Sequence, residues 1–175
     1  MNIPNILSVS RILLLIPIII FFENEFFFLS LTTYIVAAVT DYLDGYFARQ
    51  QNQTSELGAL LDQLADKLFI SVLLIWMTFN FDSKLILFSS ILIVTREISI
   101  SYLRLLIVSK SKHFNEVKSN LLGKYKTAIQ MIGLGLILIS PITPNVILNF
   151  SLALLTFSAV ISWYSLLKYS NQWIV

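Results

Sequence analysis

The sequence is short both of cysteine and of charge. Its 175 residues include no cysteine, so the chain forms no disulfide bond and no thiolate metal site. Charged residues make up 13% of the chain, about half of the roughly 25% that soluble domains carry. The formal net charge of +2 is too small to indicate a nucleic acid as partner. These absences argue against a soluble domain and against a cysteine-ligated metal protein.

The chain is correspondingly rich in hydrophobic residues. They make up 57% of the chain, and the mean hydropathy is +0.80. A 20.0 kDa globule has too much surface for its volume to bury them all. The composition therefore predicts an integral membrane protein with a single domain, residues 1–175. The apolar N-terminus ends in Phe and Glu rather than at a small-residue cleavage site, so we expect it to be retained and not removed as a signal peptide.

Six stretches approach the length of about 20 mainly apolar residues that a helix needs to cross a bilayer. Polar or proline-containing breaks separate them, and there is no internal repeat. The fold class we predict is an all-α integral membrane protein with six transmembrane helices. The expected spans are residues 6–22, 27–48, 57–79, 84–108, 121–140 and 146–168.

Basic residues are distributed unevenly between the two sides of these spans. With an even number of spans both termini share a side, and seven basic residues fall there: Arg11, Arg49, Lys110, Lys112, Lys118, Lys124 and Lys168. The opposite loops hold only Lys84, beside Glu23, Glu25 and Asp82. The positive-inside rule then predicts a multi-pass protein of the inner (cytoplasmic) membrane, with both termini in the cytoplasm.

Half of the ten acidic residues lie between positions 41 and 66. If both spans are helical, Asp41 and Asp44 share one helical face, and Asp62 and Asp66 share another. A short loop makes the two helices antiparallel neighbours, so the four carboxylates can converge. Unpaired, they would repel one another and resist desolvation. Divalent cations resolve the conflict, and an all-oxygen set suits Mg²⁺, Mn²⁺ or Ca²⁺ rather than zinc or copper. Four carboxylates are more than one Mg²⁺ usually takes from protein, which points to two ions.

The residue pattern leaves other interpretations open. The aspartates could form a structural ion-pair network with Arg49, Lys67, Arg96 or Arg104, or line the path of a metal-ion or proton transporter. Small residues on the same faces could admit a ligand or only allow close helix packing. The buried polar residues crowd the cytoplasmic half, which favours a cavity open to the cytoplasm over a path through the membrane.

The aspartates also belong to a longer pattern that resembles a known family, the CDP-alcohol phosphotransferases. All eight fixed positions of the family signature are present with its spacing: Asp41, Asp44, Gly45, Ala48, Arg49, Gly58, Asp62 and Asp66. Members of this family transfer a phosphatidyl or phosphoalcohol group from a cytidine-diphosphate donor to a hydroxyl acceptor and release CMP. The resemblance implies a six-helix membrane domain with an N-terminal juxtamembrane segment, a homodimer, and a site that faces the cytoplasm.

Three further segments, "MNIPNILSVSRI", "REISISYLRLL" and "LGKYKTAIQM", are similar to those of the bacterial members that use glycerol 3-phosphate as acceptor. The likeness implies CDP-diacylglycerol as donor and phosphatidylglycerophosphate as product. Acceptors such as inositol phosphate, serine, phosphatidylglycerol or an amino alcohol remain the alternatives within the family. One departure is Gln63, where a proline is common.

The resemblance also assigns roles to residues. It implies that Asp41, Asp44, Asp62 and Asp66 hold two Mg²⁺ or Mn²⁺ ions, and we choose Asp66 as the general base. The CDP-diacylglycerol site would comprise Gly45, Ala48, Arg49 and Gly58, with Pro4, Asn5 and Ser8 closing over it. The anionic acceptor needs cations, and the candidates are Arg96, Arg104, Lys124 and Lys126. For Arg96 the alternative is a structural pair with Glu97 or an aspartate, and for the two lysines it is contact with lipid headgroups.

Overall fold

A computed structural model describes the backbone of residues 3–51, 56–111 and 121–174. Side chains are described for residues 9–40, 64–103 and 126–168. The described residues are almost entirely helical. Their elements are α1 (Ile3–Glu23), α2 (Phe27–Gln51), α3 (Glu56–Asn80), α4 (Lys84–Ser111), α5 (Leu121–Ile139), the 3-10 turn η2 (Ser140–Ile142) and α6 (Asn145–Ile174).

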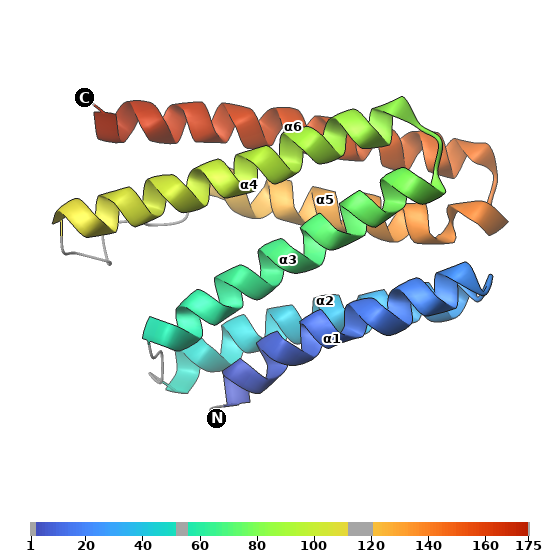
Figure 1. The fold of residues 1–175 in the computed structure, drawn as a ribbon, viewed down its shortest axis with the longest axis horizontal. Helices are drawn as coiled ribbons and strands as arrows, with labels where there is room; N and C mark the ends of the chain where they lie inside the picture. The colour runs from blue at the N-terminus through green and yellow to red at the C-terminus, as the bar shows by residue number, and fades with distance from the viewer. Residues whose placement is uncertain (1–2, 52–55, 112–120, 175) are drawn as a thin grey trace.

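The helices run back and forth along one long direction (Figure 1). Helices α1 and α2 pack against each other, α4 and α5 pack on α6, and α3 crosses between these two groups with contacts to α1 and α4. Both termini lie at one end of the bundle, where α2 and α4 also end. Residues 24–26, 81–83 and 143–144 connect the helices at the opposite end.

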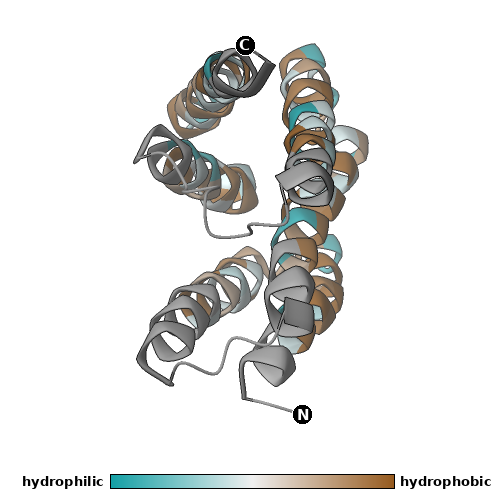
Figure 2. Cartoon of the chain, turned by 90° about the vertical axis from the view of Figure 1, so that its left-hand side faces the viewer, coloured by the Kyte–Doolittle hydropathy of each residue, from teal (hydrophilic) through white to brown (hydrophobic). Residues whose placement is uncertain are grey.

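The helices bury one apolar core and leave a second apolar surface exposed. The core takes side chains from all six: Ile18, Tyr34, Ala37, Phe69, Leu73, Leu74, Met77, Ile93, Leu134, Ile137, Leu138 and Leu155. Large apolar side chains also lie exposed along the outside of the helices, among them Leu13, Ile16, Ile20, Phe28, Val36, Phe88, Phe150, Phe157 and Val160. Figure 2 shows apolar residues along the helices, with hydrophilic ones in the minority. Soluble monomers rarely expose so much apolar surface.

Two helical segments in the described part of the chain are long and apolar enough to cross a membrane. They are Lys84–Leu103 within α4 and Asn145–Lys168 within α6, and two shorter apolar segments are Phe27–Thr40 and Lys126–Ile142. Together with the exposed apolar surface, these segments indicate a membrane protein.

The predicted spans agree closely with the helices. Five of them lie inside single helices, and the span at residues 121–140 runs one residue into η2, where Pro141 follows the end of α5. Helix α1 already begins at Ile3, so the N-terminal segment continues directly into the first apolar stretch. The prediction that all six cross the membrane extends beyond the two segments identified by length and composition.

Small residues and buried polar groups join α5 to its neighbours. A Cβ atom on Gly133 would lie 3.2 Å from Leu155 of α6, so the glycine permits the close approach of these two helices. On the other side of α5, the Tyr34 hydroxyl of α2 donates to the carbonyl oxygen of Met131 at 2.8 Å. Helix α5 is thus fixed between α2 and α6, which sets the position of the residues near its start.

Candidate active site

The four aspartates of the signature lie on two unbroken helices. Helix α2 continues through positions 41 and 44, and α3 through positions 62 and 66. The helical backbone confirms the premise on which the shared faces were predicted. Of the four side chains, only that of Asp66 lies among those described. The others fall outside them, as do those of Gly45, Ala48, Arg49 and Gly58, and those of Pro4, Asn5 and Ser8 in α1.

Asp66 forms an ion pair with Arg11 of α1. The Arg11 Nη1 donates to Asp66 Oδ1 across 55 positions of sequence, where α1 and α3 pack together. The Arg11 side chain is 2% exposed and that of Asp66 is 41% exposed. A buried cation therefore holds one oxygen of a carboxylate that faces outward. Helix packing supplies this contact, because Leu15 and Ile18 of α1 belong to the same core as Phe69 of α3.

The sequence analysis did not include Arg11 among the site residues. A signal was nevertheless present, since Arg11 is the only charged residue between Met1 and Phe22. An arginine within an apolar helix is costly unless it finds a partner. What the sequence could not supply was the identity of that partner among the acidic residues.

The donor set fits a hard divalent cation, as far as the described residues reach. Asp66 offers a half-exposed carboxylate, and the three other aspartates are of the same oxygen-donor type that Mg²⁺ takes in proteins. Among the described side chains, no group of three or more potential metal ligands comes together. A metal site here would need Asp41, Asp44 and Asp62, whose side chains lie outside those described.

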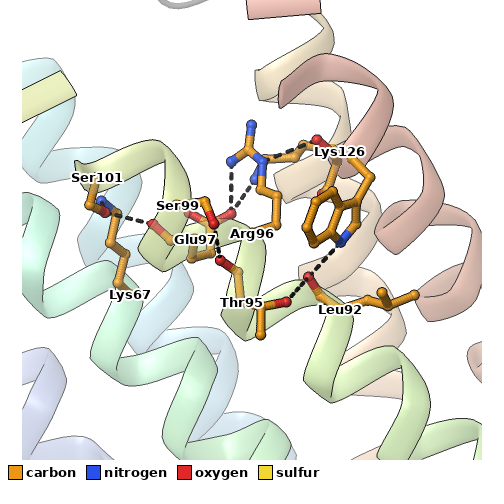
Figure 3. Close-up of polar contacts among 10 residues, drawn as sticks. Lys67, Leu92, Thr95, Arg96, Glu97, Ser99, Ser101 and Lys126 are labelled. Carbon is orange, nitrogen blue, oxygen red and sulfur yellow. Dashed lines mark hydrogen bonds and ion pairs between the residues drawn. The ribbon is translucent and has the colours of Figure 1, made fainter. Parts of the chain in front are cut away.

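A second polar cluster lies between α4, α5 and α6 (Figure 3). The carboxylate oxygen Oε1 of Glu97 accepts from Arg96 Nη1 at 3.0 Å and from Lys126 Nζ. The Arg96 Nε donates to the carbonyl oxygen of Ser162 at 3.1 Å. Arg96 and Lys126 are only 6% and 4% exposed. The structure thus brings together two of the four cations predicted for the acceptor.

These contacts bear on the alternatives for each cation. Arg96 does pair with Glu97, which was its structural alternative. Lys126 is buried in an ion pair, so contact with lipid headgroups does not describe it. The backbone of the other two candidates is helical: Arg104 lies in α4 and Lys124 in α5. Their side chains lie outside those described.

Lys67 links α3 to α4 beside the second cluster. It follows Asp66 in α3, and its Nζ donates to the hydroxyl of Ser101 in α4. That hydroxyl in turn donates to the carbonyl oxygen of Glu97 at 2.6 Å. The chain of contacts runs from the aspartate helix to the residue that holds the two cations (Figure 3).

Comparison with known proteins identifies the family of the chain. The family model of the CDP-alcohol phosphatidyltransferases matches residues 1–167. The chain belongs to this family. The match includes both the aspartate helices and the Arg96–Glu97–Lys126 cluster, so both clusters are parts of a CDP-alcohol phosphatidyltransferase domain.

Curated relatives cover nearly the whole chain. The chain is 34% identical over 176 residues to the CDP-diacylglycerol–glycerol-3-phosphate 3-phosphatidyltransferase of Escherichia coli strain K12. It is 31% identical over 172 residues to the protein of the same name from Salmonella choleraesuis. Each alignment spans 96% of this chain and 92% of the relative. The phosphatidyltransferase described here is thus similar to these enzymes from end to end.

Proposed function

We propose that the chain transfers the phosphatidyl group of CDP-diacylglycerol to sn-glycerol 3-phosphate, giving phosphatidylglycerophosphate and CMP. The observation that carries this proposal is the end-to-end similarity to two enzymes named for that reaction. Membership in the CDP-alcohol phosphatidyltransferase family supports the donor. The reaction belongs to anionic phospholipid biosynthesis.

The acceptor carries a phosphate, which requires cations near the reacting hydroxyl. Arg96 and Lys126 are buried cations whose charged groups meet at one carboxylate oxygen, Glu97 Oε1. In our proposal they bind the phosphate of glycerol 3-phosphate, with Arg104 and Lys124 as further candidates. A neutral acceptor such as serine would make no use of this excess of positive charge.

The chemical step assigned to Asp66 is proton removal. The acceptor hydroxyl attacks the phosphorus that bears the diacylglycerol, and its proton passes to the Asp66 carboxylate. A new phosphorus–oxygen bond forms to the acceptor, and the bond from that phosphorus to the CMP oxygen breaks. Arg11 contributes by holding Asp66 Oδ1, which restricts the carboxylate to one orientation.

A divalent cation cofactor is part of the proposal. Asp41, Asp44, Asp62 and Asp66 would hold two Mg²⁺ or Mn²⁺ ions, which when bound neutralise the diphosphate and the departing CMP. Gly45, Ala48, Arg49 and Gly58 would contact the cytidine diphosphate, with Pro4, Asn5 and Ser8 beside them.

We place the enzyme in the inner (cytoplasmic) membrane, with six spans, surrounding lipids and both termini in the cytoplasm. The excess of basic residues on the side of the termini supports this orientation. The position of both termini at one end of the bundle is consistent with it (Figure 1). A homodimer is proposed from the family resemblance.

The test is CMP release by the detergent-purified protein supplied with CDP-diacylglycerol and Mg²⁺. Glycerol 3-phosphate, inositol phosphate, serine and phosphatidylglycerol are compared with no acceptor, for the wild type and for Asp66→Asn. We expect release with glycerol 3-phosphate alone and its loss in Asp66→Asn. Release with a different acceptor would retain the family chemistry and overturn the acceptor. No release with any acceptor, from folded protein that binds Mg²⁺, would favour the transporter.

A further inference from the structure

Glu97 lies between two cations that come from different helices. Its Oε1 atom is shared by Arg96 Nη1 of α4 and Lys126 Nζ of α5. The three side chains are 17%, 7% and 6% exposed, in the order Glu97, Arg96, Lys126. Two like charges buried this closely would repel each other, and a shared carboxylate offsets that repulsion.

The Arg96–Glu97 contact is not one that helix geometry produces by default. Adjacent residues of an α-helix point about 100° apart and do not face each other. The two side chains nevertheless meet at 3.0 Å, because the Arg96 guanidinium is also held by the Ser162 carbonyl oxygen of α6. The pair therefore depends on the packing of α4 against α6.

A second reciprocal contact strengthens this packing. Trp163 of α6 donates from Nε1 to the carbonyl oxygen of Leu92 in α4 at 3.0 Å. Arg96 thus reaches α6 from α4, while Trp163 reaches α4 from α6 one helical turn away (Figure 3). Glu97 then joins Lys126 of α5 to a guanidinium that α6 already holds.

The cluster concentrates donors to an anion. Arg96, Lys126 and Glu97 together carry a formal charge of +1 and are largely buried, where screening by solvent is weak. Guanidinium and ammonium groups each carry several donors, so contact with Glu97 does not prevent contact with a phosphate. One more polar group lies nearby in sequence: Gln130, one turn after Lys126, is 1% exposed, and its Nε2 has no hydrogen-bond partner among the described residues.

We propose that Glu97 is a positioning residue that holds Arg96 and Lys126 at the separation required to bind the phosphate of the acceptor. This inference rests on the proposed function and adds to it the device that assembles the acceptor site. Glu97 itself does not contact the reacting atoms. It acts through the two cations, because its carboxylate joins Lys126 of α5 to Arg96 of α4.

The experiment measures binding and turnover separately on the full-length protein in detergent. Binding of sn-glycerol 3-phosphate is followed by titration calorimetry, and the KM values for both substrates come from CMP release. The variants are Glu97→Gln, Glu97→Asp, Lys126→Met and the double variant Glu97→Gln/Lys126→Met. Glu23→Gln is the matched control, because Glu23 accepts a hydrogen bond from Trp76 at the other end of the bundle, at 3.0 Å.

We expect Glu97→Gln to raise both the Kd and the KM for glycerol 3-phosphate by about tenfold or more, as for loss of a charged hydrogen-bond partner. In Glu97→Gln the KM for CDP-diacylglycerol should stay within about twofold of wild type. In the control Glu23→Gln the KM values for both substrates should do the same, as is usual for surface substitutions. Glu97→Asp, which keeps the charge, should recover part of the loss. The double variant should be little worse than Lys126→Met alone, because Arg96 is also held by the Ser162 carbonyl oxygen, so that the loss of Glu97 acts mainly on Lys126.

Several results would overturn the inference. An unchanged Kd in Glu97→Gln would do so, and tighter binding would show that Glu97 competes with the phosphate. A parallel rise in both KM values would indicate a general loss of structure. Wild-type protein that binds no glycerol 3-phosphate would also overturn it, even if another acceptor supports CMP release. Protein that binds glycerol 3-phosphate as expected and releases no CMP with it would refute the proposed function and leave the inference standing.

Discussion

Replacing Arg11 tests how the structure supports Asp66. Arg11→Met keeps most of the side-chain length and removes the cation that contacts Asp66 Oδ1. The Arg11 side chain is buried, and methionine is a flexible apolar side chain that adapts to buried sites, so loss of the charge is the main change. Arg11→Lys keeps a cation but cannot reproduce the planar guanidinium contact.

The expected magnitude follows from the exposure of the two partners. Removing one member of a fully buried pair costs about 3–5 kcal/mol, whereas an exposed pair contributes about 0–1 kcal/mol. Arg11 is 2% exposed and Asp66 41% exposed, so solvent screens the pair from one side. We therefore expect a loss of about 1–2 kcal/mol. For a chain of this size that lowers the Tm by roughly 2–8 °C.

The effect on catalysis should exceed the effect on stability. A carboxylate released from Arg11 samples orientations in which it cannot take the hydroxyl proton, and misplacement by about 1 Å costs on the order of 100-fold. Thermal unfolding in detergent and CMP release are measured for Arg11→Met, Arg11→Lys and the control Leu13→Met. Leu13 lies on the same helix and is 59% exposed. If Arg11→Met kept both the Tm and the kcat of the control, the pairing with Asp66 would have no part in the site.

Three further predictions concern the metal and the helix packing. Chelation of divalent cations should stop CMP release and added Mg²⁺ should restore it, whereas activity that persists in chelator would refute the carboxylate metal site. Gly133→Val should lower the Tm, since overpacking costs about 1–3 kcal/mol and a Cβ there would already lie 3.2 Å from Leu155; an unchanged Tm would contradict the close α5–α6 contact. Trp163→Phe removes the donor to the Leu92 carbonyl oxygen and should cost about 0.5–1.5 kcal/mol in unfolding free energy. A Trp163→Phe protein as stable as wild type would show that this bond adds nothing to α4–α6 packing.

Local sequence patterns were enough to predict the helices and the family. Long apolar stretches interrupted by polar residues and proline predicted six helices. The structure has them within three residues of the predicted bounds, except that α6 continues six residues beyond its predicted end. The spacing of Asp41, Asp44, Asp62 and Asp66 pointed to the family that matches residues 1–167. Both signals depend on residues close together in the chain, so neither requires knowledge of how the helices pack.

The ion-pair partners of the charged residues could not be predicted from such local patterns. The sequence analysis left Arg96 a choice between substrate and a structural pair, and Lys126 a choice between substrate and lipid headgroups. It gave Arg11 no role in the site. In the structure Arg11 reaches Asp66 from another helix, and Glu97 joins Arg96 to Lys126 across α4 and α5.

The sequence by itself determined which segments are helical, that the protein is rich in apolar surface, and which family chemistry its aspartates suit. Only the tertiary structure decided which cation meets which carboxylate. The physical reason is that a charged pair depends on the crossing and register of two helices to within a few ångströms. Many side chains along both helices set that register together, and no short motif records it.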